Sequence, residues 1–490
     1  MIQDLKALIV VVGIFFLARR FLRPVLMPIT GAATFDGWVK TWLGITVVAF
    51  LVPSYWPAMI LIGAVLLTMP ARNPEARVAT YFGVMCAAPT LNGDVPFPGI
   101  NYLIELDYTR LLSLTLLLPV GMRMYREGVF RGRWEVWDRA MAISVLLALA
   151  LGMRDTTFTG ALRGTVELVL SVTVPYFVLS RAIRTRQQFD VCIALFVAGM
   201  VVVAGIAMFE TLRHWKVYDA VTELYRDRSF RYENRGGFSR ASVSFGTPIA
   251  LGFALALALG ALMYLRQLLA RPRAGSIMLL VICAGLFSTV SRGPWIGAVM
   301  MIGLFVMLGR DGVRKAVQLG LAGVLALGLL AMTPAGKNIV ELLPFVGDTR
   351  SDTVDYRFRL ITAARQTFTR NPWFGTNNPL RYPEMQAMRQ GQGIIDLVNT
   401  YIQVGLYTGG VGLVIFLLSV AWPVLPLHRE LRSRNALPPV TSDACRALLA
   451  SQMGSLLIIG TVSAVSFIPA LMWANTALCV AFLRSARQWN

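Results

Sequence analysis

The chain has 490 residues, of which 56% are hydrophobic and 15% are charged. This composition excludes a soluble domain of the same size, because most elements must face lipid or one another. The formal net charge of +20 gains a meaning only when each basic residue is assigned to one side of a membrane. The five cysteines form neither a CxxC pattern nor a Cys/His spacing, so neither disulfides nor a structural zinc is predicted.

Apolar runs long enough to cross a hydrocarbon core recur along the whole chain. The first run ends in Arg19 and Arg20 without a small-residue cleavage site, which favours a retained helix over a signal peptide. We predict an all-α fold, a single polytopic domain of about 14 transmembrane helices over 1–490, the first being marginal in length. The predicted spans are 4–19, 38–53, 55–70, 76–89, 109–123, 136–152, 161–180, 188–209, 241–265, 274–290, 294–309, 314–332, 396–422, 444–466 and 468–484.

Short basic connections between the spans predict the orientation of the bundle. All of them fall on one side, which the positive-inside bias makes the cytoplasmic side. Two long polar stretches, 210–240 and 333–395, then lie on the outer side. The basic connections are 123–139, 181–186, 266–273, 310–315, 428–434 and the C-terminal tail.

Both outer stretches are rich in arginine, although outer loops usually carry few basic residues. The first contains Arg235 and Arg240, and the second contains Arg357 and Arg359. One interpretation is that these arginines bind an anion. The other is that long loops cross the membrane regardless of charge and that neighbouring acids pair with the arginines on a solvated surface. Arg292, at a short turn between two apolar helices, is harder to explain as surface decoration.

The second outer stretch contains a predicted helix. Residues 351–353 can cap it, and the Asn-Pro pair at 371–372 ends it. Such a helix would lie flat on the membrane or on the bundle, with Arg357 and Arg359 at headgroup depth. A lid that only covers the bundle fits the pattern equally well. The positions on its apolar face are Val354, Phe358, Ile361, Ala364 and Phe368.

Three passages follow one another around the outer stretches. They read RGGFSRASVSFGTPIALGFAL at 235–255, SRG at 291–293, and FRLITAARQTFTRNPWFGTNN at 358–378 with DLVNTYIQVGLYTGGVGLVIF at 396–416. In order and spacing they resemble the O-antigen ligase and Wzy-type polysaccharide polymerase superfamily of bacterial inner-membrane glycosyltransferases. The spacing from Arg235 to Gly246 also matches the RX10G pattern of some polymerases.

One position departs from the ligases of this family. They place a histidine before the asparagine of the third passage, whereas Val398 precedes Asn399 here, and the two histidines of the chain are His214 and His428. The departure favours a polymerase over a ligase that acts on lipid A core.

The resemblance implies transfer of a glycan from an undecaprenyl diphosphate carrier to a sugar hydroxyl at the periplasmic face of the inner membrane. The expected partners are the lipid-linked oligosaccharide, membrane lipids, a chain-length regulator and a flippase, with no nucleic acid. No cofactor is expected. Because the outer stretches contain no DxD-like pair, we expect a metal-independent glycosyltransferase in which arginines replace the cation.

The residue types suit this reaction. A diphosphate leaving group needs positive charge where negative charge develops, and the fork of arginine matches phosphate oxygens. As the base that accepts the hydroxyl proton, Asp396 is the first choice, and Glu233 and Asp355 are the alternatives. An aspartate at this place can instead cap the following helix. The candidate diphosphate-binding residues are Arg235, Arg240, Arg292, Arg357 and Arg359, with Asn399, Tyr401 and Gly246 in support.

Three functions therefore compete. The first is a polymerase of lipid-linked exopolysaccharide or O-antigen repeat units. The second is a ligase that delivers such glycans to lipid A core or protein. The third is a transporter of polyprenyl-linked sugars, which predicts charges near the middle of the membrane and repeat symmetry between halves. No such repeat is visible in the sequence, and the arginines gather in the outer stretches.

Overall fold

The computed structural model describes most of the chain. The described residues are 2–70, 73–89, 91–132, 134–219, 221, 234–235, 237–333, 336, 342, 351–389, 393–432 and 437–489. Glu233, a candidate base, lies outside them. The helices, in chain order, are α1 (Ile2–Thr30), α2 (Ala32–Leu51), α3 (Tyr55–Thr68), α4 (Pro74–Val84), α5 (Tyr108–Leu112), α6 (Leu118–Arg126), α7 (Val136–Gly152), α8 (Phe158–Leu168), α9 (Val174–Ala182), α10 (Arg186–Arg213), α12 (Pro248–Leu265), α13 (Pro272–Ser288), α14 (Arg292–Met307), α15 (Gly312–Ala331), α17 (Ser351–Arg370), α18 (Pro383–Gln386), α19 (Thr400–Ala421), α20 (Val424–Arg432), α21 (Pro439–Ile459) and α22 (Ile468–Ser485).

The predicted helical character is confirmed, with one correction. Two short antiparallel hairpins, β1 (Gly93–Phe97) with β2 (Ile100–Leu106) and β3 (Asn234–Arg235) with β4 (Phe238–Ser239), interrupt the helices. π-Helical segments, Ser113–Leu117 and Val169–Thr173, join α5 to α6 and α8 to α9. The prediction of an all-α chain missed the hairpins because both are short and lie in polar connections.

Each predicted span overlaps a helix, but several spans differ from the helices at one end. Helix α1 continues to Thr30 beyond the predicted end at 19, and α4 ends at Val84 before the predicted end at 89. The predicted starts at 241 and 396 lie before the observed helix starts at Pro248 and Thr400, and the predicted end at 466 lies beyond Ile459. Among the described residues, six helical segments are long and apolar enough to cross a membrane. They are Phe158–Ala182, Arg186–Arg213, Pro248–Leu265, Gly312–Leu329, Thr400–Arg432 and Ile468–Ser485, and shorter apolar helices are Tyr55–Thr68, Pro272–Ser288 and Arg292–Met307.

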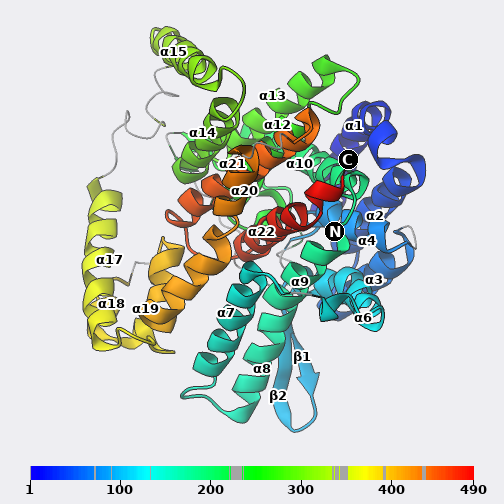
Figure 1. Ribbon diagram of the computed structural model, residues 1–490. Helices are drawn as coiled ribbons and strands as arrows, with labels where there is room; N and C mark the ends of the chain where they lie inside the picture. The colour runs from blue at the N-terminus through cyan, green and yellow to red at the C-terminus, as the bar shows by residue number, and fades with distance from the viewer. Residues whose placement is uncertain are drawn as a thin grey trace.

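Helix α10 lies at the centre of the bundle and is buried along most of its length. It packs on α1, α4, α12 and α13 (Figure 1). Small residues allow these contacts, because a Cβ on Gly199 would lie 2.7 Å from the backbone oxygen of Gly83 in α4, and a Cβ on Gly285 of α13 would lie 2.6 Å from Ala204. Close backbone approach of this kind is typical of membrane helix bundles.

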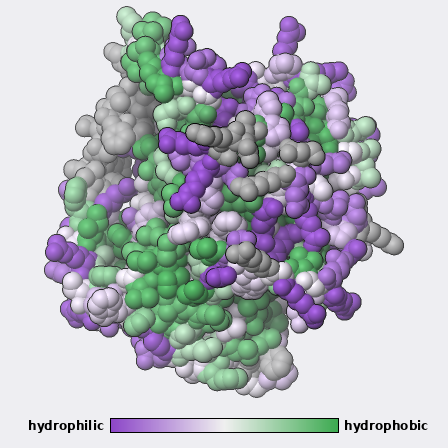
Figure 2. Space-filling model, in the orientation of Figure 1, coloured by the Kyte–Doolittle hydropathy of each residue, from purple (hydrophilic) through white to green (hydrophobic). Residues whose placement is uncertain are grey.

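A broad apolar surface covers α7, α8 and α19 (Figure 2). Its exposed side chains include Leu146, which is 64% exposed, Phe158, which is 85% exposed, and Val414, which is 56% exposed. Contiguous apolar surface of this kind would be unfavourable in water and suits contact with lipid. The burial pattern therefore supports a multi-pass membrane protein.

An ion cluster ties three helices together at one end of the bundle. Asp138 of α7 is fully buried, forms an ion pair with Arg181 of α9 at 3.2 Å, and accepts a hydrogen bond from Arg484 of α22. The guanidinium of Arg181 also lies 4.9 Å from the ring centroid of Phe177. Because the predicted basic connections 123–139 and 181–186 and the C-terminal tail meet here, the cluster marks the predicted cytoplasmic end.

Helix α17 ends at Arg370 as predicted, and its buried face overlaps the predicted one in part, because Ala364 is buried and Phe368 packs on the same cluster. Leu360, Ala363 and Ala364 are buried, whereas Phe358 is 67% exposed and Ile361 is 53% exposed. The helix turns the Leu360 face toward α18 and α19. The helix carries two overlapping apolar faces. The face with Leu360, Ala363 and Ala364 packs on α18 and α19, whereas Phe358 and Ile361 remain exposed.

Candidate arginine site

The candidate site is built on the turn between α13 and α14. The guanidinium of Arg240 donates from Nε to the Thr289 carbonyl at 3.2 Å and from Nη2 to Ser291 Oγ at 3.0 Å. Arg235 Nη1 donates to the Val290 carbonyl at 3.4 Å. Arg292, the next residue of the turn, donates from Nε to the carbonyl of Leu342 at 3.1 Å. Three arginines from two chain segments therefore meet at one turn.

The local sequence explains how Arg235 and Arg240 reach this turn. In the β3–β4 hairpin Arg235 pairs with Phe238, and Gly237 supplies the left-handed backbone (φ 80°) that the tight turn needs. The Phe238 ring packs edge-on against Phe287 of α13, with ring centroids 6.4 Å apart. The Ala241 N–H then donates to the Ser288 carbonyl at 2.9 Å. The chain is thus fastened to α13 on both sides of Arg240.

Glu210 holds the two ends of the first outer stretch together. It is 1% exposed, and its carboxylate accepts from the backbone N–H groups of Val217, Ser242 and Val243, each at 3.0 Å. A carboxylate buried in this way is stable only when such donors replace water. Glu210 therefore positions the segment that carries Arg240.

Asp396 lies before α19 and is held from two sides. Its Oδ1 accepts from Ser463 Oγ at 2.7 Å and from the Val398 N–H at 3.1 Å, and its backbone carbonyl accepts from Tyr356 OH at 2.8 Å. Asp396 does not cap the helix, which was the alternative interpretation. Its carboxylate is half-buried at the place where α17, α19 and the segment after α21 meet.

Asn399 and Tyr401 have structural partners. Asn399 is the N-cap of α19, and its Oδ1 accepts from the N–H groups of Tyr401 at 2.8 Å and Ile402 at 3.1 Å. Its Nδ2 donates to the Gly460 carbonyl at 2.8 Å, and Tyr401 OH donates to the Leu456 carbonyl at 2.6 Å. Both residues thereby join α19 to α21.

The segment 460–467, which connects α21 to α22, contacts each of the three passages that carry the family resemblance. Its Ser466 Oγ donates to the Phe245 carbonyl at 2.7 Å, beside Gly246. A Cβ on Gly293 would lie 2.4 Å from Thr461 Oγ1. Ser463 Oγ donates a hydrogen bond to Asp396 Oδ1. We call 460–467 the hub segment, since it brings the arginine turn and the start of α19 into one neighbourhood.

Strained backbone gathers in the same neighbourhood. Val243, Val290 and Val398 have φ of 47°, 45° and 41°, a left-handed conformation that is unusual for a β-branched residue. Ser466 in the hub segment has φ 54°. Such conformations cost about 1–3 kcal/mol each and are typical of functional sites. Val290 immediately precedes Ser291, and Val398 immediately precedes Asn399.

The glycine-rich part of α19 receives the end of the second outer stretch. Gly409 breaks the helix with φ 69°, and the Gly410 N–H donates to the Pro372 carbonyl at 2.7 Å. A Cβ at Gly409 would lie 2.3 Å from the Trp373 backbone, so no larger residue fits. On its other side this loop contacts α7, where Arg154 Nη2 donates to the Phe374 carbonyl at 2.9 Å.

Two predicted arginines are not at the turn. Arg357 and Arg359 are exposed on α17. The residue of that helix that reaches the site is Tyr356, through the carbonyl of Asp396. Arg235, Arg240 and Arg292 therefore form the observed cluster, which does not include Arg357 and Arg359.

Sequence reasoning missed Glu210, Tyr356, Ser463 and Ser466. Glu210 stood out only as an acid that ends a long apolar run. The two serines fell inside the apolar runs around 460–467. Their polarity was a signal that the predicted span had ended.

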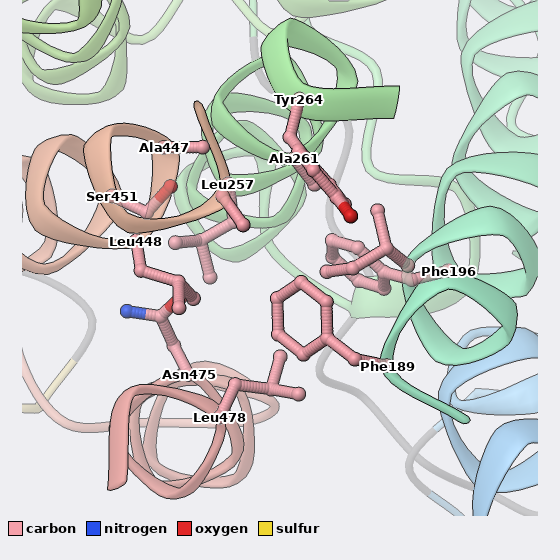
Figure 3. Close-up of a pocket in the computed structure, with 12 residues that line it drawn as sticks. Phe189, Phe196, Leu257, Ala261, Tyr264, Ala447, Leu448, Ser451, Asn475 and Leu478 are labelled. Carbon is pink, nitrogen blue, oxygen red and sulfur yellow. The ribbon is translucent and has the colours of Figure 1, made fainter. Parts of the chain in front are cut away.

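A small cavity inside the bundle is separate from this site. It lies between α10, α12, α21 and α22, has a volume of about 30 Å³, and is lined mainly by apolar side chains such as Phe189, Phe196 and Leu257 (Figure 3). Ser451 and Asn475 contribute polar atoms to its wall. A cavity of this size accommodates little more than a water molecule.

Comparison with known families identifies the region around the arginine turn. Residues 277–417 match the model of a family described as O-antigen ligase. This segment is similar to the O-antigen ligase family. The matched residues include the Arg292 turn, α17 and the start of α19, so the match confirms the predicted resemblance. The O-antigen ligase match leaves Arg235, Arg240 and the hub segment outside its bounds. A search of curated proteins found no match to the chain.

The O-antigen ligase match supports an enzyme of the glycosyltransferase type in polysaccharide biosynthesis. Together with the apolar helices it supports a multi-pass membrane protein. The matched family acts on lipid-linked glycans.

Proposed function

We propose that the protein is a polymerase of undecaprenyl diphosphate-linked oligosaccharide repeat units at the periplasmic face of the inner membrane. The observation that carries the proposal is the meeting of Arg235, Arg240 and Arg292 at one turn, next to a hub segment that also holds Asp396. This arrangement offers cationic forks for a diphosphate and a carboxylate for a hydroxyl proton.

The reaction follows from these groups. The acceptor hydroxyl oxygen attacks the anomeric carbon of the donor, and the bond between that carbon and the diphosphate oxygen breaks. The diphosphate leaves with the bonding electron pair, and the arginines stabilise the charge that develops on it. Asp396 accepts the hydroxyl proton. Tyr356 of α17 donates to the backbone carbonyl of Asp396 and so helps to position this base.

Val398 supports polymerisation over ligation, because ligases of this family have a histidine at that position. A ligase that delivers glycan to lipid A core or protein is the second candidate, and the description of the matched family favours it. A transporter is less well supported, since the clustered arginines lie at helix ends and not midway along the helices.

The polysaccharide made by cells that lack the protein tests the function. For a polymerase we expect single repeat units attached to their final acceptor, because transfer to that acceptor continues without chain extension. Electrophoresis of the acceptor-linked and carrier-linked fractions measures this. Long polymer retained on the lipid carrier would instead identify a ligase, and an unchanged pattern would exclude both activities.

Replacing Asp396 with asparagine is expected to lower kcat by about 100- to 10,000-fold, with little change in the KM of the lipid-linked donor, because the amide still accepts from Ser463 but cannot take a proton. Steady-state kinetics with purified protein measures both constants. The matched control is Asp311→Asn, which changes an exposed carboxylate just before α15. Equal losses in both variants would remove the role of Asp396 as base.

Removal of divalent metal is expected to leave the activity unchanged. Arginine is fully protonated at all working pH values and supplies the charge that Mg²⁺ supplies in metal-dependent glycosyltransferases. The rate of chain extension before and after dialysis against EDTA measures this. A loss that Mg²⁺ or Mn²⁺ restores would contradict the proposed role of the arginines.

A further inference from the structure

A second basic feature lies far from the arginine turn. A groove of about 860 Å³ opens between α1 and the start of α13. It is next to the end of α12, where Tyr264 OH donates to Asp190 near the start of α10. From Asp190 to Glu210 at the arginine site, α10 rises roughly 30 Å at 1.5 Å per residue. The groove therefore lies at the opposite end of the bundle, the predicted cytoplasmic end.

The groove combines two kinds of lining. Its cationic residues are Arg20, Arg271 and Arg273, which are exposed and whose guanidinium groups make no hydrogen bond or ion pair within the described part of the chain. Among the residues that the structure describes, none that lines the groove is acidic. Its remaining lining residues are Leu17, Phe21, Pro24, Val25, Ala270, Pro272, Ala274 and Ile277.

The apolar wall continues onto lipid-facing surface. Leu17 is 72% exposed on α1, and Ile277 and Leu280 are 46% and 68% exposed on α13. The groove thus combines three guanidinium groups, from Arg20 within α1 and from Arg271 and Arg273 at the start of α13, with apolar side chains along both helices. A molecule that fits the groove must therefore contain both an anionic group for the arginines and hydrocarbon for the apolar wall.

We infer that this groove binds an anionic phospholipid, with the phosphate at Arg20, Arg271 and Arg273 and the acyl chains along Leu17, Phe21 and Ile277. Basic pockets between transmembrane helices are suited to such headgroups, and each basic residue near an anionic lipid surface contributes a several-fold gain in binding. The volume is ample for a headgroup and the first part of its chains. A bound lipid would join α1 to α13, both of which pack on α10.

Binding of labelled phosphatidylglycerol to the purified full chain in detergent micelles tests the inference. We expect saturable binding that exceeds binding of phosphatidylcholine. The variant R20Q/R271Q/R273Q should weaken phosphatidylglycerol binding roughly 100-fold, since three charges are lost. The matched control R126Q/R131Q/R139Q removes three exposed arginines from another predicted cytoplasmic connection and should bind as the unchanged protein does.

A second variant separates a lipid from a free anion. Replacing Leu17 and Ile277 with glutamine removes apolar wall at exposed positions, so the fold is retained, and it should weaken phosphatidylglycerol binding while leaving all three arginines in place. Equal binding by the triple variant and its control would overturn the inference, as would equal binding of the two phospholipids. Inorganic phosphate that competes as strongly as the lipid would show that the acyl chains are not recognised, which also contradicts it.

Discussion

Replacing Arg240 with alanine is expected to lower the kcat of chain extension by about 100- to 1000-fold, the loss typical of removing one preorganised donor to a developing anion. Arg240 is fixed in place by its bonds to the Thr289 carbonyl and Ser291 Oγ. A fixed cation needs no reorganisation when the diphosphate leaves, so its effect falls on the transition state. Kinetics with a purified lipid-linked repeat unit measure the loss.

Two further variants make this result specific. Arg240→Lys keeps the charge but cannot make both bonds of the fork, so its kcat should lie between those of the unchanged protein and the alanine variant. Arg213→Ala removes an exposed arginine from the last turn of α10, near the same end of the bundle, and should retain activity. If Arg240→Ala keeps its kcat while its thermal unfolding is unchanged, Arg240 has no part in the reaction.

The helical elements could be predicted from apolar runs, because a run of sufficient length must satisfy its own backbone in lipid. The site was harder to predict for the same reason. Residues 241–247, 396–399 and 460–466 are apolar enough to extend neighbouring spans, yet none is part of the adjoining long helix, and all of them contribute to the site. An apolar sequence is expected both for a helix in lipid and for a turn buried in protein. Composition alone therefore cannot show where a helix ends and a buried turn begins.

Contacts with residues far away in the sequence decide which of the predicted arginines reach the turn of Arg292. Composition identified Arg235, Arg240, Arg357 and Arg359 as equal candidates, but the structure brings only the first two to the turn of Arg292. The difference arises from Glu210, whose three backbone partners lie at 217, 242 and 243 and are not recognisable from sequence spacing. A buried side chain that binds backbone N–H groups produces no recognisable sequence motif, because almost any residue type can supply the backbone group.

The largest expected effect on stability comes from Asp138→Ala, at the other end of the bundle. Asp138 is fully buried between Arg181, whose side chain is 5% exposed, and Arg484, whose side chain is 22% exposed. Removing one partner of a buried ion pair leaves the remaining charge without compensation, which costs about 3–5 kcal/mol. The unfolding midpoint in detergent should fall sharply, and the amount of folded protein in the membrane should fall with it.

An exposed ion pair provides the control for this prediction. Glu127 accepts from Arg123 at 2.8 Å, with side chains 46% and 62% exposed, so Glu127→Ala should cost less than about 1 kcal/mol. Both variants remove a carboxylate that is paired with arginine, so a difference between their unfolding midpoints reports the effect of burial. Asp138→Asn should be intermediate, since the amide oxygen still accepts a hydrogen bond but carries no charge. Equal midpoints for Asp138→Ala and Glu127→Ala would mean that water reaches the cluster and that α7, α9 and α22 are held together by apolar packing alone.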